Sequence, residues 1–181
     1  VSPLFKISIK PNAYILDLGT GGGLPGIPWA ILNESANFLL LDGTKKKIDA
    51  VSNIVKELGL ENVKTLWGRA ENIGKMDEYK NRFDYVICRA VADLKTLVKW
   101  SFNFLSKFSK KFLENTSEGY YLHSGCLIAF KGGDVKYEIE DALKTKLVSG
   151  VEVIDLNFKG FEKVGLEDKK VVLLKLTTKR D

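Results

Sequence analysis

The fold of this chain is decided by residues 14–26, which read YILDLGTGGGLPG. The apolar residues at the start predict a strand, and the glycines that follow open into a helix near Pro25. Glycines accept a positive φ and carry no Cβ, so a ligand can lie against bare backbone at the start of that helix. The stretch therefore predicts a ligand-binding loop between a strand and a helix.

Apolar runs of strand length alternate with helix-like segments along the rest of the chain. The predicted strands are Tyr14–Leu18, Asn37–Asp42, Val63–Trp67, Phe83–Arg89, Cys126–Lys131, Val151–Leu156 and Val171–Thr177. The predicted helices are Pro25–Asn33, Lys45–Leu58, Leu94–Phe108 and Val135–Leu147. Most of the strands are nearly continuous apolar runs, which is typical of parallel strands covered on both faces. The last two strands are joined by the hairpin-like stretch Asn157–Lys170, which predicts an antiparallel strand at the sheet edge.

Composition places the chain among ordinary globular proteins. A length of 181 residues fits one domain, and the chain is 45% hydrophobic and 28% charged. No apolar run approaches the length of a membrane span and no leader pattern is present, so we expect a cytoplasmic protein. Cys88 and Cys126 lie far apart in apolar stretches without paired histidines, so a zinc site lacks ligands. The net charge of +5 permits a nucleic-acid partner but does not require one.

A few residues stand outside this pattern. Residues Ser106–Ser124 form a basic, polar excursion, which we expect to be a solvated loop. Trp29, Trp67 and Trp100 lie at core spacing and are expected to pack in the interior. His123, the only histidine, is expected at the surface.

Two ligand patterns overlap in the glycine loop. Gly21–Gly26 fits the G-x-G-x-x-G pattern of dinucleotide-binding proteins, and Asp42 follows about twenty residues on, where ribose hydroxyls are bound. Asp17–Gly23 fits the acidic-x-G-x-G-x-G pattern of S-adenosylmethionine-dependent methyltransferases. A carboxylate at Asp17 repels a pyrophosphate but attracts the ammonium group of a methionine moiety. The loop therefore favours S-adenosylmethionine, with Asp42 on the ribose or capping the next helix, two compatible roles.

Further motifs point to one family. Residues 16–28 read LDLGTGGGLPGIP, and the tail GLPGIP is unusually specific. Other motifs follow in order: Leu41-Asp42 before Lys45-Lys46-Lys47, Arg69-Ala70-Glu71, Phe83-Asp84, Arg89-Ala90-Val91-Ala92 and Phe130-Lys131-Gly132. From about Pro11 onward the chain resembles the glucose-inhibited division protein B family of bacterial methyltransferases. The resemblance implies an α/β, Rossmann-like class I methyltransferase fold, with a seven-stranded, mostly parallel sheet in the order 3-2-1-4-5-7-6.

Members of that family are understood to methylate N7 of one guanine in 16S ribosomal RNA. The resemblance implies S-adenosyl-L-methionine as cofactor, 16S ribosomal RNA or the small ribosomal subunit as partner, and no metal or membrane. Together with the loop pattern, it implies these cofactor-binding residues: Asp17, Gly19, Thr20, Gly21, Gly23, Leu24, Asp42, Ala70, Glu71 and Arg89. The implied RNA-binding residues are Lys45, Lys46, Lys47 and Lys131.

The absence of other catalytic motifs fits methylation at N7. The position after the fourth strand reads Cys88-Arg89-Ala90-Val91, not the Asp/Asn-Pro-Pro-aromatic motif of exocyclic amine methylation. Cys88 lies within an apolar strand, where a thiol is more often buried than nucleophilic. Guanine N7 carries a free lone pair and no proton, so its methylation needs alignment rather than a base. Arg89 is therefore expected to position the reactants, and no general base is expected.

Two departures from the family keep alternatives open. Only about a dozen residues precede Tyr14, so we expect residues 1–181 to form a single methyltransferase domain that largely lacks the family's N-terminal helical segment. The Ser106–Ser124 excursion is longer than the family leads us to expect. The alternatives are a methyltransferase for another RNA site or a small molecule, and a non-catalytic RNA-binding assembly module. A dinucleotide-dependent oxidoreductase is a third, against which Asp17 argues.

Overall fold

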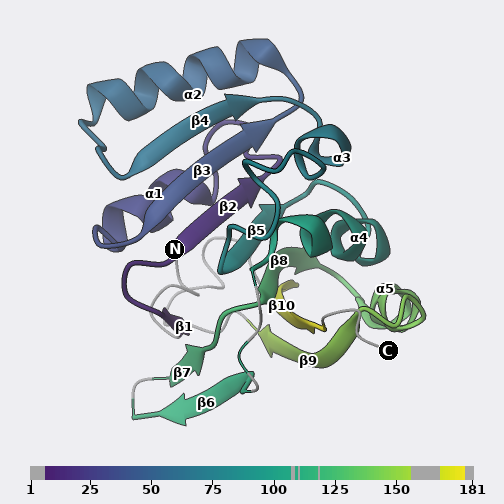
Figure 1. Cartoon of the computed structure of the whole chain (residues 1–181). Coiled ribbons are helices and arrows are strands. Elements are labelled where there is room, and N and C mark those ends of the chain that lie inside the picture. The colour runs from purple at the N-terminus through teal and green to yellow at the C-terminus, as the bar shows by residue number, and fades with distance from the viewer. Residues whose placement is uncertain (1–6, 107–108, 110, 118, 156–167, 178–181) are drawn as a thin grey trace.

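A seven-stranded sheet forms the centre of the molecule (Figure 1). The computed structural model of the chain describes residues 7–106, 109, 111–117, 119–155 and 168–177. Its strands are β2 (Tyr14–Leu18), β3 (Asn37–Asp42), β4 (Val63–Trp67), β5 (Tyr85–Arg89), β8 (Cys126–Gly132), β9 (Val148–Asp155) and β10 (Lys169–Leu176). They lie in the order β4-β3-β2-β5-β8-β10-β9. The predicted order 3-2-1-4-5-7-6 is therefore confirmed. The antiparallel strand is β10, which lies one place in from the edge strand β9.

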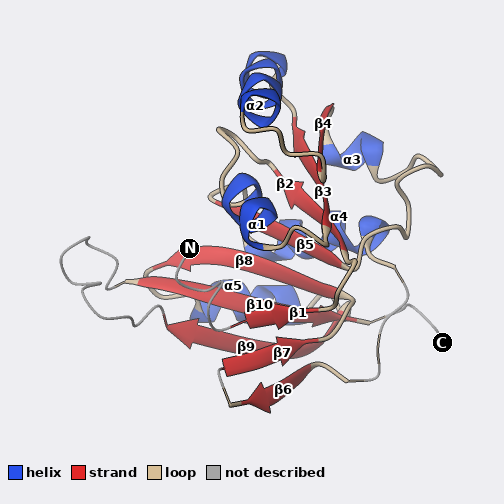
Figure 2. Ribbon diagram, turned by 90° about the vertical axis from the view of Figure 1, so that its left-hand side faces the viewer, coloured by secondary structure: helices blue, strands red, loops and turns tan. Residues whose placement is uncertain are grey.

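Helices cover both faces of the sheet. They are α1 (Gly26–Leu32), α2 (Lys45–Glu57), α3 (Ala70–Ile73), α4 (Leu94–Phe104) and α5 (Lys136–Leu143). Figure 2 shows α1 and α2 on one side of β2, β3 and β4, and α3 and α4 on the other. Successive side chains of a strand point to opposite faces, so Ile15 and Leu16 of β2 belong to two separate buried clusters. Strands buried on both faces explain the continuous apolar runs of the sequence.

The Ser106–Ser124 excursion is not the solvated loop that we expected. Within it, β6 (Leu113–Thr116) pairs antiparallel with β7 (Gly119–Leu122), and β7 pairs parallel with β1 (Ile7–Ile9). The resulting three-stranded sheet buries Ile7 and Leu122 in the cluster on the α1 face. Its short strands carry little apolar pattern of their own, and the burial of Ile7 and Leu122 depends on the pairing of β1 with β7, about a hundred positions away in the sequence.

Element boundaries differ from the predicted ones where tertiary contacts decide them. Helix α4 ends at Phe104 rather than Phe108, because Leu105 turns to extended backbone and forms a bridge with Phe83. The short helix α3 was not predicted, and β5 begins two residues later than expected. Most of the predicted Asn157–Lys170 connection lies outside the described residues.

The turn from β2 into α1 is held by the buried carboxylate of Asp17. Its Oδ2 accepts hydrogen bonds from the Thr20 hydroxyl at 2.6 Å and from the Gly26 backbone N–H at 2.9 Å. A Cβ on Gly26 would collide with Leu40 and with this carboxylate, so only glycine fits there. Burial raises the pKa of Asp17 to about 6, although its two hydrogen bonds and the charge of Arg89 act in the opposite direction.

This raised pKa predicts a pH-dependent stability. The native state holds the Asp17 proton to a higher pH than the unfolded chain, so Asp17 should lower the free energy of unfolding as pH rises from about 4 to about 6. Over this range the free energy of unfolding should fall by about 3 kcal/mol. Urea unfolding of the wild type and of Asp17→Asn across this range would isolate it, since an amide keeps an acceptor oxygen but does not titrate. Parallel pH profiles of the two proteins would contradict the prediction.

Candidate active site

The loops that carry the predicted site residues gather at one edge of the sheet. Strands β2, β3, β4 and β5 are parallel, so their carboxyl ends meet there. In Figure 1 the arrowheads of β2, β3 and β4 point to this edge, near α3. Ligands of open α/β sheets bind outside the carboxyl ends of the strands. The predicted site therefore occupies the expected place in the fold.

Asp42 joins the glycine loop to the chain that leads into α2. Its Oδ2 accepts from the Gly21 N–H at 3.0 Å, and its Oδ1 accepts from the Thr44 N–H at 2.8 Å. Thr44 is the N-cap residue of α2, so Asp42 shapes the turn before the helix instead of capping the helix itself. A carboxylate has about four acceptor positions, and these bonds use two of them. The remaining positions can accept hydrogen bonds from ligand hydroxyls.

The turn after β5 packs directly on the glycine loop. Gly19 has a φ of +72°, and a Cβ built on it would lie 2.6 Å from the Val91 Cγ2 atom. Glycine at this position is therefore required both by the backbone conformation and by the close approach of Val91. Arg89, which precedes this turn, ends β5 and is exposed. The contact brings the Arg89 turn and the glycine loop together, and sequence reasoning missed the role of Val91 in it.

The loop after β4 closes the other side of the edge. Its Gly68 N–H donates to the Asp42 carbonyl at 3.0 Å. The Arg69 side chain lies on Gly43, where a Cβ would come within 3.0 Å of the Arg69 Cδ. Ala70 and Glu71 then begin α3, with Glu71 exposed. The structure thus brings the predicted residues Ala70 and Glu71 to the same edge as Asp42.

The predicted residues of the glycine loop have different surroundings. Thr20 is buried, and its hydroxyl points inward to Asp17, so it shapes the loop. Leu24 is exposed. The Asp17 Oδ1 is buried and has no hydrogen-bond partner among the described residues. An unpaired buried acceptor beneath the loop fits a ligand that presents a positively charged donor there.

The four predicted RNA-binding lysines do not lie together. Lys45, Lys46 and Lys47 form the exposed first turn of α2, and Lys45 pairs with Asp49 at 2.9 Å. Lys131 is placed differently from our expectation, since its side chain is only 14% exposed and its ammonium bonds within the protein. An ammonium bonded within the protein is not available to an RNA phosphate, so we no longer propose Lys131 as an RNA contact.

Trp67 is exposed, contrary to the expectation that all three tryptophans pack inside. Trp29 is 1% exposed, whereas Trp67 is 57% exposed. Trp67 lies opposite Asp42 in the sheet register, as the last residue of the edge strand β4. Its indole N–H donates to the Gly43 carbonyl at 3.2 Å. A fixed, exposed aromatic ring therefore borders the candidate site.

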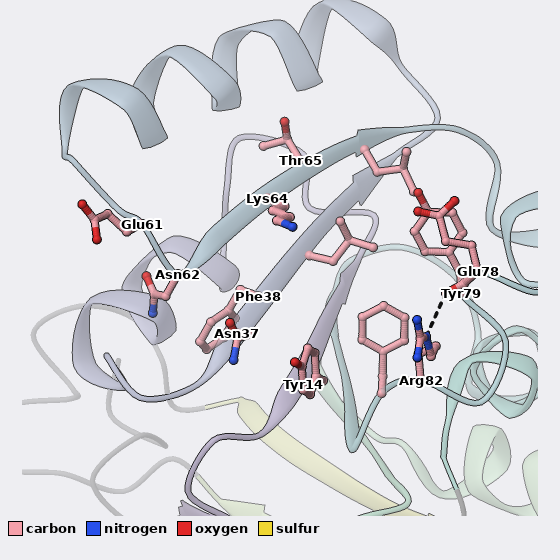
Figure 3. A pocket seen from close by; sticks show the side chains of 13 residues that line it. Tyr14, Asn37, Phe38, Glu61, Asn62, Lys64, Thr65, Glu78, Tyr79 and Arg82 are labelled. Carbon is pink, nitrogen blue, oxygen red and sulfur yellow. Dashed lines mark hydrogen bonds between the residues drawn. The ribbon is translucent and has the colours of Figure 1, made fainter.

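A cavity of about 510 Å³ lies elsewhere on the sheet. Figure 3 shows it between strands β2, β3 and β4 and the segment Glu78–Phe83, where the Arg82 Nε donates to the Glu78 carbonyl at 3.1 Å. Tyr14 and Asn37 in its lining are the first residues of β2 and β3, at the amino ends of the strands. None of the predicted site residues lines it. The cavity is thus separate from the carboxyl edge.

The cysteines and the histidine supply no nucleophile or base at this edge. Burial raises the pKa of the Cys88 thiol above its ordinary range and that of Cys126 to about 12, which keeps both protonated at neutral pH. His123 is partly buried, not at the surface as expected, and its Nε2 lies 3.1 Å from Glu114 Oε1 on the small sheet. No three potential metal ligands cluster among the described residues. Within the same residues, every helix is too short or too polar to cross a membrane.

Several known proteins are similar to this chain over most of its length. Residues 2–172 match the family described as rRNA small subunit methyltransferase G, GidB. The ribosomal RNA small subunit methyltransferase G of Porphyromonas gingivalis is 40% identical over 133 residues, covering 74% of this chain and 53% of that protein. The protein of the same name from Christiangramia forsetii is 35% identical over 172 residues, covering 95% and 71%. The chain spans about half to two thirds of the length of several curated relatives that it matches.

Solved structures show the same fold at low sequence identity. A SAM dependent methyltransferase from Aquifex aeolicus has a TM-score of 0.62 at 14% identity, covering 93% of this chain and 84% of its own. The M. jannaschii TYW2 structure in complex with AdoMet has a TM-score of 0.62 at 14% identity, covering 96% and 70%. The fold is therefore that of the class I methyltransferases. With the family match over residues 2–172 and the relatives above, the chain belongs to the rRNA small subunit methyltransferase G family.

Proposed function

We propose that this chain transfers the methyl group of S-adenosyl-L-methionine to N7 of a guanine in 16S ribosomal RNA. One observation carries the proposal: the Asp42 carboxylate links the acidic glycine loop to the start of α2, at the edge where the turn after β5 meets that loop. Membership of the rRNA small subunit methyltransferase G family supports the RNA substrate. The same arrangement supports a single catalytic domain within residues 1–181.

The residues at the edge fit the parts of S-adenosylmethionine. The bound group would supply an electrophilic methyl on a sulfonium. The Gly19–Gly23 backbone and the unpaired Asp17 Oδ1 would hold the methionine part, whose ammonium group suits a buried acceptor. The free acceptor positions of Asp42 would take the ribose hydroxyls. Ala70 and Glu71, on the far side of Asp42, would border the adenine.

Methyl transfer to N7 does not require the protein to remove a proton from the acceptor. The N7 lone pair lies in the plane of the ring and carries no proton, so the acceptor is ready to attack. The protein must align the base, exclude water and balance charge. Arg89 would do this, because it ends β5 two residues before Val91, which packs on the glycine loop, and its charge acts on Asp17 beneath that loop. Its planar guanidinium can engage a phosphate, the methionine carboxylate or the N7 and O6 edge of guanine.

The surface beside this edge suits an exposed stretch of RNA. In A-form RNA the major groove that contains N7 is deep and narrow, so the target base must come from a loop or an opened region. Unstacked bases bind aromatic rings, and phosphates bind cations. Trp67 offers an exposed ring, and Lys46, Lys47 and Arg69 are exposed cations on the neighbouring segments. We assign the RNA contacts to these residues together with Lys45.

Methylation with radiolabelled S-adenosylmethionine tests the proposal. The substrates are naked 16S ribosomal RNA and small ribosomal subunits from a strain that lacks this methyltransferase, and the label is then mapped by nucleotide. Label at N7 of one guanine supports the proposal. Cofactor binding without label in any RNA points instead to the non-catalytic module, and label at another RNA position points to a different specificity.

The Asp42 assignment predicts a loss of cofactor affinity. Asp42→Ala should weaken S-adenosylmethionine binding by about 1–3 kcal/mol, because it removes an ionised acceptor for the ribose and loosens the glycine loop. Asp49→Ala, which removes an exposed carboxylate one turn into α2, is the control and should bind as the wild type does. Calorimetry measures both affinities. Equal affinities in the two variants would remove Asp42 from the site.

The Arg89 assignment predicts a loss of rate. Arg89→Ala should slow methyl transfer about a hundredfold, since orientation is lost, while thermal stability changes little for an exposed side chain. Arg89→Lys should restore only part of the rate, because an ammonium lacks the planar fork. Lys99→Ala, an exposed cation on α4, controls for net charge. If both Arg89 variants methylate at the wild-type rate, Arg89 does not orient the reactants and the assignment is wrong.

The exposed ring of Trp67 predicts a specific loss of RNA affinity. Trp67→Ala should weaken RNA binding about tenfold, within the range for one stacked base, and Trp67→Phe should retain most of the affinity. Tyr137→Ala removes another exposed aromatic ring, 77% exposed on α5, and should change nothing. Filter binding measures RNA affinity, and calorimetry measures cofactor affinity. A loss of cofactor affinity instead would place the ring against the adenine.

A further inference from the structure

We propose that Lys131 is a positioning residue, which with Glu138 holds the turn after β5 in place against the glycine loop. The proposal deepens the proposed methyl transfer and rests on it for its kinetic part. It gives Lys131 a role in aligning the reactants without any contact to them.

The Lys131 ammonium joins three elements in a partly desolvated site. It donates to the Ala92 carbonyl at 2.8 Å and to Glu138 Oε2 at 2.6 Å. The same Glu138 oxygen accepts from the Leu94 N–H at 2.9 Å, at the first residue of α4. The two side chains are 14% and 36% exposed. Lys131 of β8 and Glu138 of α5 therefore bond to the backbone on both sides of Asp93, at Ala92 and at Leu94.

The segment held in this way is conformationally strained and lies on the glycine loop. Ala90 has a φ of +55°, which is uncommon for a residue with a side chain. Such a conformation is energetically unfavourable and persists only where the surroundings determine it. The next residue, Val91, is the one that packs on Gly19. The hydrogen bonds at Ala92 and Leu94 thus hold the backbone two and four residues after Ala90.

The other end of the turn is fixed by the sheet. Arg89 pairs with Phe130 in the β5–β8 ladder, and Lys131 is the next residue of β8. Lys131 thus follows Phe130, which pairs with Arg89 at the start of the turn, and the Lys131 side chain bonds to Ala92 at the end of the same turn. Without the ammonium, the Ala92 carbonyl and the Glu138 carboxylate lose this common donor. The turn then gains other conformations, and both Arg89 and Val91 lose their fixed relation to the glycine loop.

Three variants separate positioning from simple stability. Lys131→Met keeps length but removes the charge, and should lower the single-turnover methyl-transfer rate at saturating substrates ten- to a hundredfold, while it weakens cofactor binding less than Asp42→Ala does. Lys131→Arg should recover part of the rate, because it restores a cationic donor. Glu138→Gln removes the partner charge, and its effect should not add to that of Lys131→Met, since both break one unit.

A second ion pair at the opposite edge of the sheet supplies a matched control. Lys10 Nζ lies 2.8 Å from Asp84 Oδ1, and the side chains are 46% and 9% exposed. Lys10→Met also leaves a shielded carboxylate without its cation, so both variants should melt at a lower temperature than the wild type. Only Lys131→Met should slow methyl transfer per folded molecule. If the two variants keep equal, wild-type rates, Lys131 is merely structural and the proposal is overturned.

Hydrogen exchange decides the proposal independently of activity. In Lys131→Met, amides of residues 91–94 and 19–23 should exchange faster than in the wild type, whereas in Lys10→Met they should not. Unchanged exchange at these residues in Lys131→Met would overturn the proposal even if the rate falls. If the wild-type protein methylates no RNA, the proposed function fails, and the exchange result still shows whether Lys131 holds the turn.

Discussion

The buried carboxylate of Asp17 is the constraint on which the candidate site depends. It is the last residue but one of β2, accepts a hydrogen bond from the first N–H of α1 and another from Thr20 between them, and so ties strand, loop and helix together. Removing a carboxylate from water is costly, which appears as its raised pKa. The rest of the edge builds on this unit, because Asp42 bonds to the Gly21 backbone and Val91 packs on Gly19. A change at Asp17 would therefore reach every loop of the site.

The sequence predicts those parts of the molecule that local pattern determines. The parallel strands are long apolar runs, and the glycine loop carries its own conformational requirement, so the positions of strands and loop follow from the chain alone. The order of the strands in the sheet came from the family resemblance. The same reasoning brings Asp42, Ala70, Glu71 and Arg89 to one edge, because each lies at the end of a parallel strand or just after it. Their roles toward a ligand remain proposals, since a position at an edge does not by itself make a contact.

The parts that the sequence did not predict depend on partners distant in the chain. Lys131 reads as one more surface cation until Ala92 and Glu138 are seen around its ammonium. Trp67 reads as a core residue from its spacing along an apolar strand, yet β4 is the edge strand of the sheet and only Val63 in it is buried. The small sheet reads as a polar loop, since neither β6 nor β7 has a buried face until β1 is paired. In each case the missing information was a tertiary neighbour, which composition and period do not contain.

The parallel pairing of β1 with β7 has a consequence for the order of folding. Residues 7–9 leave the ribosome long before residues 120–122, their partners in the ladder, have been synthesised. Strand β1 therefore cannot pair with β7 until β2, β3, β4 and β5 have been synthesised. Until then, β7 presents an unpaired edge and β1 an apolar segment without cover. In the nascent chain both segments are therefore prone to aggregation until they meet, and a chaperone would find two binding sites about a hundred residues apart in the sequence.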